Sequence, residues 1–171
     1  LKAAIRDEDP VLFFEHKKGY RLWRGEVPEE DYVIPLGKAD VKRPGKDLTV
    51  ITYGWNVHLC LEAAERLARE DGFEAEVIDL RTVAPLDRET IVASVKKTGR
   101  VMISHEDTKT GGIGAEVSAI IAEEALFYLD APIQRVAPPD VPAMPYNSVL
   151  EKAFMPSAEQ QYEAMRELAR F

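Results

Sequence analysis

The sequence predicts an α/β fold, a three-layer sandwich in which a mainly parallel sheet of at least four strands carries helices on both faces. Four short apolar runs, rich in β-branched residues, alternate with four stretches of helical periodicity. Apolar positions in the first run, residues 48–54, do not alternate, as expected for a strand that is covered on both faces. Right-handed crossovers between parallel strands then place helices on both sides of the sheet.

The residues before the first of these strands predict a separate segment. We expect the end of a helix over residues 1–6, a turn before Pro10, and a short buried strand over residues 11–14. Three spaced prolines, Pro28, Pro35 and Pro44, then indicate an extended connector laid over a surface. Because the chain begins with a leucine inside this helical pattern, we expect it to be a fragment or a processed product.

The first helix of the α/β pattern follows residues 48–54. Asn56 is a candidate N-cap, and Asp71-Gly72 ends the periodic stretch. Its apolar stripe consists of Val57, Cys60, Leu61, Ala64, Leu67 and Ala68. The second strand is expected over residues 75–80. The second helix has Asp87 as its cap, two lysines in its last turn, and Gly99 as its end.

The remaining elements continue the alternation. We expect a third strand over residues 101–104 and a third helix over residues 114–128, which is apolar nearly all round and should be deeply buried. A fourth strand over residues 133–136 precedes a long proline-rich loop. The last helix begins with the capping-box pair Ser157 and Gln160. Its inner face is expected to hold Tyr162, Met165, Leu168 and Ala169.

The composition narrows the class of protein. With 171 residues, of which 46% are hydrophobic, the chain is long enough for one domain with an appendage and its own core. A formal charge of -8 argues against nucleic-acid binding, and no apolar run approaches the roughly 18 residues of a membrane helix. The single cysteine excludes an internal disulfide and a cysteine metal cluster.

Candidate functional groups gather where the predicted strands end, since ligands of open α/β sheets bind at that edge. These groups are Trp55, Asn56, Arg81, Thr82, His105, Glu106, Asp107 and Asp140. Neighbouring residues of a strand point to opposite faces, so His105 and Glu106 cannot share one site if the strand continues. We favour a structural role, with His105 hydrogen-bonded at a buried edge and Glu106 solvated or paired.

Other motifs carry little functional signal. The run of Gly111, Gly112 and Gly114 lacks the third glycine of the dinucleotide fingerprint, and close packing of helix on strand explains it equally well. There is no P-loop, GxSxG, CxxC or HExxH motif. Cys60 is expected to be a small core residue that does not face His58. His16 is expected to be a surface or interface histidine.

Four separated blocks carry a resemblance to a known family. They are residues 9–17 (DPVLFFEHK), 76–87 (EVIDLRTVAPLD), 103–106 with 110–112 (ISHE, TGG), and 131–136 (APIQRV). In this order they resemble the C-terminal half of the β subunit of thiamine-diphosphate-dependent 2-oxo acid dehydrogenases, which contains a transketolase C-terminal domain. The first and third blocks are more similar to the branched-chain (2-oxoisovalerate) type than to the pyruvate type.

The resemblance implies a domain organisation and a division of labour. Residues 1–15 would be the end of an N-terminal pyrimidine-binding domain, residues 16–46 a linker, and residues 47–171 the transketolase C-terminal-like domain. In the whole enzyme, thiamine diphosphate with magnesium would support decarboxylation of a 2-oxo acid and acyl transfer to lipoyl groups. The resemblance carries no catalytic, cofactor-binding or metal-binding residue onto this chain, so we expect the fragment alone to hold no cofactor and to be inactive.

The implied role is therefore assembly. The partners would be the α subunit, a second β subunit, and the subunit-binding domain of the lipoyl transacylase, with no nucleic acid and no membrane. The acidic residues Glu26, Glu29 and Glu30 and the C-terminal carboxylate of Phe171 would meet that basic docking domain, although a solvated acidic surface explains them as well. The implied location is the cytoplasm, or the mitochondrial matrix in a eukaryote.

Two alternatives remain, one from the residues themselves and one from the resemblance. One is a stand-alone α/β module, without catalysis, that binds a small molecule or a partner through the groups around His105. The other is a transketolase-like enzyme with a sugar-phosphate substrate, which the four blocks disfavour.

Overall fold

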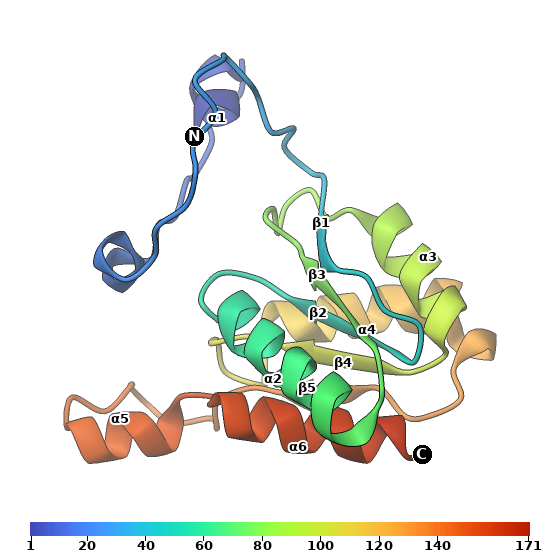
Figure 1. Ribbon diagram of the computed structural model, residues 1–171. Coiled ribbons are helices and arrows are strands. Elements are labelled where there is room, and N and C mark those ends of the chain that lie inside the picture. The colour runs from blue at the N-terminus through green and yellow to red at the C-terminus, as the bar shows by residue number, and fades with distance from the viewer.

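Five strands form a single sheet in the computed structural model, which describes residues 1–171 (Figure 1). The strands are β1 (Asp40–Arg43), β2 (Leu48–Thr52), β3 (Ala75–Asp79), β4 (Val101–Ser104) and β5 (Gln134–Val136). Their order across the sheet is β1-β3-β2-β4-β5. All neighbouring pairs except β1 and β3 are parallel, which confirms a mainly parallel sheet of at least four strands.

The edge strand β1 lies inside residues 16–46, the stretch expected to be an extended connector. It runs antiparallel to β3, with Asp40 opposite Asp79 and Val41 opposite Ile78. Three of its four residues are charged, and Val41 is 44% exposed. Charged side chains on an edge strand oppose pairing with a further strand, and they also remove the apolar pattern by which a strand is recognised in a sequence.

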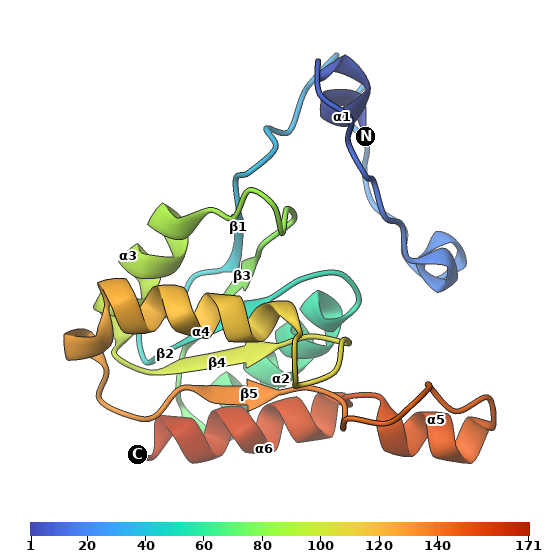
Figure 2. The same ribbon diagram turned by 180° about the vertical axis from the view of Figure 1, so that it is seen from behind.

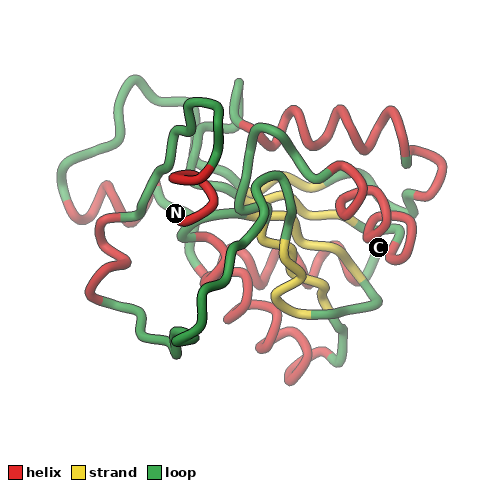
Figure 3. Tube along the Cα trace, turned by 90° about the horizontal axis from the view of Figure 1, so that it is seen from above, coloured by secondary structure: helices red, strands yellow, loops and turns green.

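Helices cover both faces of the sheet (Figures 1 and 2). One apolar core joins the sheet to α2 (Asn56–Asp71) and α6 (Ala158–Ala169), and a second joins its other face to α3 (Arg88–Thr98) and α4 (Ile113–Glu124). Val50 belongs to the first core and its neighbour Ile51 to the second, because side chains alternate along a strand. Seen from above, the strands lie between the two helix layers, so the predicted three-layer sandwich is confirmed (Figure 3).

Most predicted helix ends are confirmed. Asp87 caps α3 by accepting a hydrogen bond from the Thr90 N–H at 3.2 Å, and Ser157 forms the capping box of α6 with Gln160. Gly99 ends α3 in the left-handed conformation with φ 69°. Asn56 was wrongly predicted to cap α2: the N-cap is Trp55, and Asn56 is the first helical residue. Its amide is buried and donates to the Ser104 hydroxyl at 3.0 Å instead.

The helix predicted over residues 114–128 is shorter and less buried than its composition suggested. Helix α4 ends at Glu124, and a separate 3₁₀ turn, η2 (Leu126–Tyr128), follows it. Phe127 in this turn is 98% exposed. Burial of α4 is confined to a stripe of residues, Gly114, Val117, Ile120 and Ile121. Deep burial all round was therefore wrong, because only one side of α4 faces the sheet.

The first 36 residues form an arm that extends from the α/β body and folds back toward the start of α2 (Figures 1 and 2). Helix α1 (Lys2–Arg6) is confirmed, and Lys2 and Arg6 both pair with Asp31 at 2.9 Å. The strand predicted over residues 11–14 was wrong: these residues have no regular structure, and Phe14 is 88% exposed. An apolar run forms a strand only where a neighbouring strand pairs with it, and the arm provides none.

A short helix interrupts the stretch before α6. Helix α5 (Ser148–Phe154) follows the predicted proline-rich loop and is capped by the Asn147 side chain, which accepts from the Val149 N–H at 2.9 Å. The helix projects beyond the body, and Val149 and Leu150 are exposed (Figure 1). The sequence pattern did not reveal α5, because seven residues show too little periodicity to indicate a helix.

Candidate functional site

The predicted site lies at the carboxyl edge of the sheet, where β2 and β4 end next to each other. Thr52 and Ser104 are register partners at the ends of these strands, and the His105 N–H continues the ladder by donating to the Val136 carbonyl at 3.3 Å. The edge therefore brings Trp55, Asn56 and residues 105–107 together, as predicted. Arg81, Thr82 and Asp140 are instead engaged in separate local contacts.

His105 is a structural residue beneath the first turn of α4. Its side chain is fully buried, and its Nδ1 lies 3.0 Å from the Asp107 carbonyl oxygen. Burial lowers the pKa of the ring below its ordinary value, so the ring is neutral at pH 7. Gly114 lies directly against the ring: a Cβ added there would be 2.5 Å from Nε2. Close packing of helix on strand thus explains this glycine, as the sequence suggested.

Glu106 is paired, as predicted. Its carboxylate lies 3.7 Å from Nε2 of His16, and its side chain is 28% exposed. Burial raises the pKa of Glu106, and the nearby His16 opposes the rise. His105 and Glu106 therefore do not form one catalytic pair. The phenol of Tyr53, whose ring stacks on His105 with centroids 6.3 Å apart, has its pKa raised to about 12, chiefly by burial.

An aromatic cluster that sequence reasoning did not find joins the arm to the body. The 3₁₀ turn η1 (Lys17–Arg21) is flanked by His16 and Trp23. The His16 ring stacks on Trp55 at 4.9 Å, and Trp23 lies 4.8 Å from Trp55 and 3.7 Å from His58 between ring centroids. Burial lowers the pKa of His58. Residues more than 30 apart in sequence make these contacts, so no local spacing could have indicated them.

Beneath the edge, a buried polar cluster lies between the sheet and α2. Cys60 is fully buried, with its thiol 3.7 Å from the Gln161 side-chain oxygen of α6. Burial raises the pKa of this thiol to about 12, although the nearby Thr52 and Ser104 hydroxyls oppose the rise. This confirms Cys60 as a small core residue without nucleophilic character. It also confirms that His58, which is exposed on α2, does not face it.

The other candidate groups hold loops in place. Arg81 has the left-handed backbone conformation, with φ 55°, and its guanidinium donates to Asp40 of β1 at 2.6 Å. The Thr82 hydroxyl accepts from the Gly37 N–H at 3.1 Å. Asp140 accepts from the Thr110 hydroxyl at 2.6 Å, and this bond lowers its pKa. Each group is satisfied within the chain, which is how structural residues behave.

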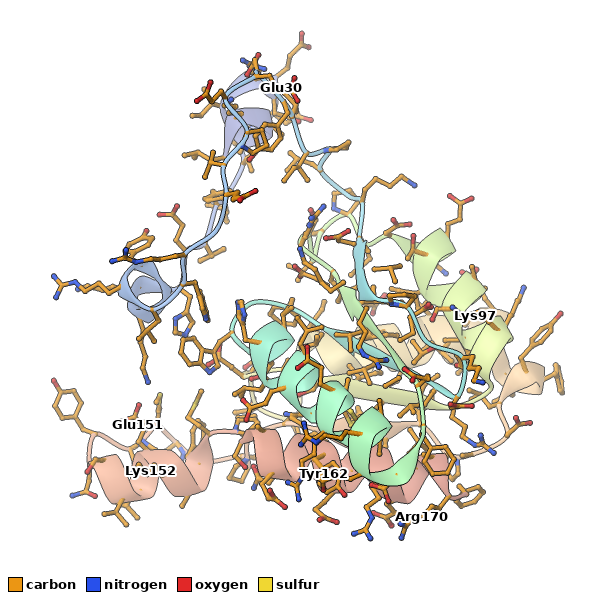
Figure 4. All side chains as sticks on the ribbon, viewed as in Figure 1. Glu30, Lys97, Glu151, Lys152, Tyr162 and Arg170 are labelled. Atoms are coloured by element: carbon orange, nitrogen blue, oxygen red, sulfur yellow. The ribbon has the colours of Figure 1, made fainter.

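A further acidic group fixes α6 against α2. Asp71, at the end of α2, accepts from the Tyr162 hydroxyl at 2.7 Å and pairs with Arg166 and Arg170. Its carboxylate has a lowered pKa, mainly because of the Tyr162 hydrogen bond. Figure 4 shows Tyr162 and Arg170 on α6, the helix that runs below α2 in this view. The cluster explains why these two helices lie side by side.

No three His, Cys, Asp or Glu side chains are placed so that they could hold a metal ion. None of the helices combines the length and the apolar composition that a membrane span requires. The edge of the sheet is packed and buried, with an aromatic cluster next to it, and three of its buried polar atoms, Thr52 Oγ1, Asn56 Oδ1 and His105 Nε2, have no hydrogen-bond partner.

The chain is similar in sequence to known proteins. Residues 37–160 match the family model described as the transketolase C-terminal domain. Two relatives from Bacillus subtilis, each aligned over all 171 residues and over 52% of its own length, are 2-oxoisovalerate dehydrogenase subunit beta, at 63% identity, and pyruvate dehydrogenase E1 component subunit beta, at 52% identity. The chain thus spans about half the length of these relatives.

A solved structure shares the fold. A split gene transketolase, described as an inactive beta4 tetramer, superposes with a TM-score of 0.72 and 29% identity, covering 85% of this chain and 46% of that one. The relatives confirm the resemblance carried by the four sequence blocks, including the higher similarity to the branched-chain type. By its family match and its three-layer fold, the chain belongs to the transketolase C-terminal domain family.

Proposed function

We propose that this chain is the C-terminal assembly domain of the β subunit of a 2-oxo acid dehydrogenase. The observation that carries the proposal is the 63% identity along the whole chain to a 2-oxoisovalerate dehydrogenase β subunit, of which the chain matches 52%. The complete enzyme would decarboxylate a branched-chain 2-oxo acid oxidatively and pass the acyl group to lipoyl groups. Its location would be the cytoplasm, or the mitochondrial matrix in a eukaryote.

Thiamine diphosphate with magnesium would supply the chemistry of the complete enzyme, because the cofactor stabilises the carbanion that decarboxylation leaves. The residues of this chain do not fit that group. His105 is enclosed beneath Gly114, Asp140 is bonded to Thr110, and Glu106 is paired with His16. The proposed cofactor site therefore belongs to other parts of the enzyme, and the isolated chain should not turn over 2-oxo acids.

Exposed apolar surface supports a role in association with the α subunit and a second β subunit. Phe14 on the arm is 88% exposed, and Tyr146 before α5 is completely exposed. Both lie on segments that project from the body (Figure 1). Large apolar side chains that are left exposed on projecting segments favour a surface that a partner covers.

Docking to a basic subunit-binding domain of the transacylase has two candidate surfaces. Glu26, Glu29 and Glu30 are exposed on the arm and make no ion pair within the chain. Phe171 lies at the marked C-terminal end below the body, whereas Glu30 is labelled at the top of the arm (Figures 1 and 4). The two surfaces expected together from the sequence are therefore separate, and they require separate tests.

A chimera tests the assembly role. This chain would replace the matching half of the Bacillus subtilis 2-oxoisovalerate dehydrogenase β subunit, and the product would be produced with its partner subunit. We expect a stable complex that decarboxylates branched-chain 2-oxo acids, while the 171-residue chain alone shows no turnover. A folded chimera that does not associate, or turnover by the isolated chain, would contradict the proposal.

Docking is tested with the subunit-binding domain of a transacylase and two variants. One is Glu26→Gln/Glu29→Gln/Glu30→Gln, and the other has one residue added after Phe171 to displace the carboxylate. We expect at least one of them to weaken binding about tenfold. Close charge pairs across an interface contribute about 1.4 kcal/mol or more to the binding free energy, which corresponds to this factor in Kd. The matched control removes three unpaired carboxylates from helices α2 and α4: Glu62→Gln/Glu65→Gln/Glu116→Gln. Equal losses in the control would refute docking at either surface.

The alternative of a stand-alone binding module gains no support from the geometry. It would need an accessible His105, and the ring is fully buried. Tight binding of a small molecule that His105→Ala abolishes, in a variant shown to be folded, would revive it.

A further inference from the structure

Residues 16–24 form the most basic stretch of an otherwise acidic chain. We call this segment the basic latch; it contains four basic residues, Lys17, Lys18, Arg21 and Arg24, and no acidic residue. Because the whole chain has a formal charge of -8, the rest of it carries -12. The latch is thus a local patch of positive charge on a negative molecule.

These four cations form no ion pair in the chain, although Lys18 is near enough to Glu106 to oppose the rise of that carboxyl's pKa. All four are exposed, and none takes part in an ion pair, whereas Lys2 and Arg6 on the same arm are both paired with Asp31. Lys18 lies over the Trp55 ring, with its Nζ 5.1 Å from the centroid, and this contact leaves its charge available. The acidic residue nearest in sequence, Glu15, accepts a hydrogen bond from the Tyr20 hydroxyl.

The latch is held on the body and is not a freely solvated charge run. Trp23 contacts both Trp55 and His58, and Gly19 is buried so closely under Trp23 that an added Cβ would overlap its ring. His16 adds its stacking on Trp55 and its contact with Glu106. A charged group presented from an anchored backbone loses less conformational entropy on binding than one on a mobile tail.

The charge distribution identifies the kind of partner. A nucleic acid or an anionic membrane is an extended negative surface, which the surrounding charge of -12 would repel. Glu26, Glu29 and Glu30 follow the latch directly, so only a small patch attracts anions. We propose that the basic latch is a docking element for a compact acidic surface on another protein. This goes beyond the proposed assembly function. There, acidic residues of this chain bind a basic domain, whereas here a basic segment of the chain binds an acidic partner.

The test measures binding of short poly-L-glutamate to the 171-residue chain by calorimetry and by tryptophan fluorescence. Both tryptophans of the chain lie in the contacts of the latch, so the emission reports on this region. We expect binding that weakens with added salt. The variant Lys17→Gln/Lys18→Gln/Arg21→Gln/Arg24→Gln should reduce the affinity at least about tenfold.

A matched control removes the same amount of charge from exposed lysines outside the latch that form no ion pair: Lys46→Gln/Lys96→Gln/Lys109→Gln/Lys152→Gln. We expect it to retain most of the affinity. Equal losses in both variants would overturn the proposal, because only net charge would then matter. Tighter binding of single-stranded DNA or phosphatidylserine vesicles than of polyglutamate would also overturn it. Trp23→Ala should weaken binding with all four charges in place, and an unchanged affinity would refute the anchoring role.

Discussion

Replacing Gly114 with alanine should destabilise the domain, against the usual effect of this change in a helix. Alanine is favoured over glycine in a helix by about 1 kcal/mol. The new methyl group, however, would lie 2.5 Å from Nε2 of His105 and 3.3 Å from Cγ2 of Ile103. Overpacking of this kind costs about 1–3 kcal/mol. His105 is fully buried and held by the Asp107 carbonyl, so it has little room to move aside.

The net effect should be a loss of up to about 2 kcal/mol, which lowers the Tm by up to about 8 °C in a domain of this size. Urea unfolding followed by circular dichroism measures the loss. The control is the same substitution in a His105→Ala background, where the ring is gone and Gly114→Ala should be neutral or stabilising. The coupling free energy between the two sites should be about 1–3 kcal/mol. Equal effects of Gly114→Ala in both backgrounds would refute the structural role of His105.

Three further predictions follow from burial and backbone geometry. Cys60 should not react with a thiol reagent in the native state and should react fully in denaturant, because burial raises its pKa to about 12. Asp87→Ala should cost about 1–2 kcal/mol at neutral pH through loss of its cap. Burial opposes ionisation of Asp87, but hydrogen bonds from backbone N–H groups outweigh it and lower the folded pKa. The stabilisation is therefore complete above the unfolded pKa, and the difference from wild type should shrink as pH falls below about 4 in pH-dependent unfolding. Gly72→Ala and Gly99→Ala both force alanine into the left-handed region, but only the second meets Asp130, at 2.4 Å, so calorimetry should show the larger loss for Gly99.

The α/β body was predictable because its elements have strong local signals. The buried strand β2 has five successive buried residues, which read as an apolar run covered on both sides. The ends of α3 and α6 follow from single side chains, Asp87 and Ser157, that satisfy free N–H groups of the first turn. Such rules act within a few residues and do not depend on the rest of the fold.

The wrong predictions share the opposite property. Residues 11–14 have strand composition without a strand to pair with, and β1 has a partner without strand composition. In both cases the presence of a neighbouring strand decides whether a strand forms, and this depends on residues far away in the sequence. Asn56 has the right residue type for a cap, but it is the first helical residue, and its side-chain NH2 donates to Ser104, 48 residues away in the sequence. Local pattern therefore predicted the elements, and long-range contacts decided the exceptions.

The candidate site shows the same limit. The structural role expected for His105 and the pairing expected for Glu106 agree with their contacts, although β4 ends at Ser104 and strand alternation does not reach Glu106. The contacts of Trp23 with Trp55 and His58 join segments that no motif connects, and they appear only in the folded chain. The sequence alone could indicate the carboxyl edge of the sheet as the place where ligands of α/β folds bind. It could not show that the N-terminal arm packs next to this edge.

The arm carries two charge patches of opposite sign next to each other in sequence. Its basic latch is anchored on the body through Trp23, and the acidic residues Glu26, Glu29 and Glu30 lie toward the outer end of the arm, where Figure 4 labels Glu30. Salt weakens every charge-driven contact of this arm, so salt dependence alone cannot assign a partner to either patch. Removing the charge of one patch at a time can, because an acidic partner should respond only to the latch and a basic partner only to the glutamates. If one partner loses affinity only for the latch variant and another only for the glutamate variant, the arm binds two different partners.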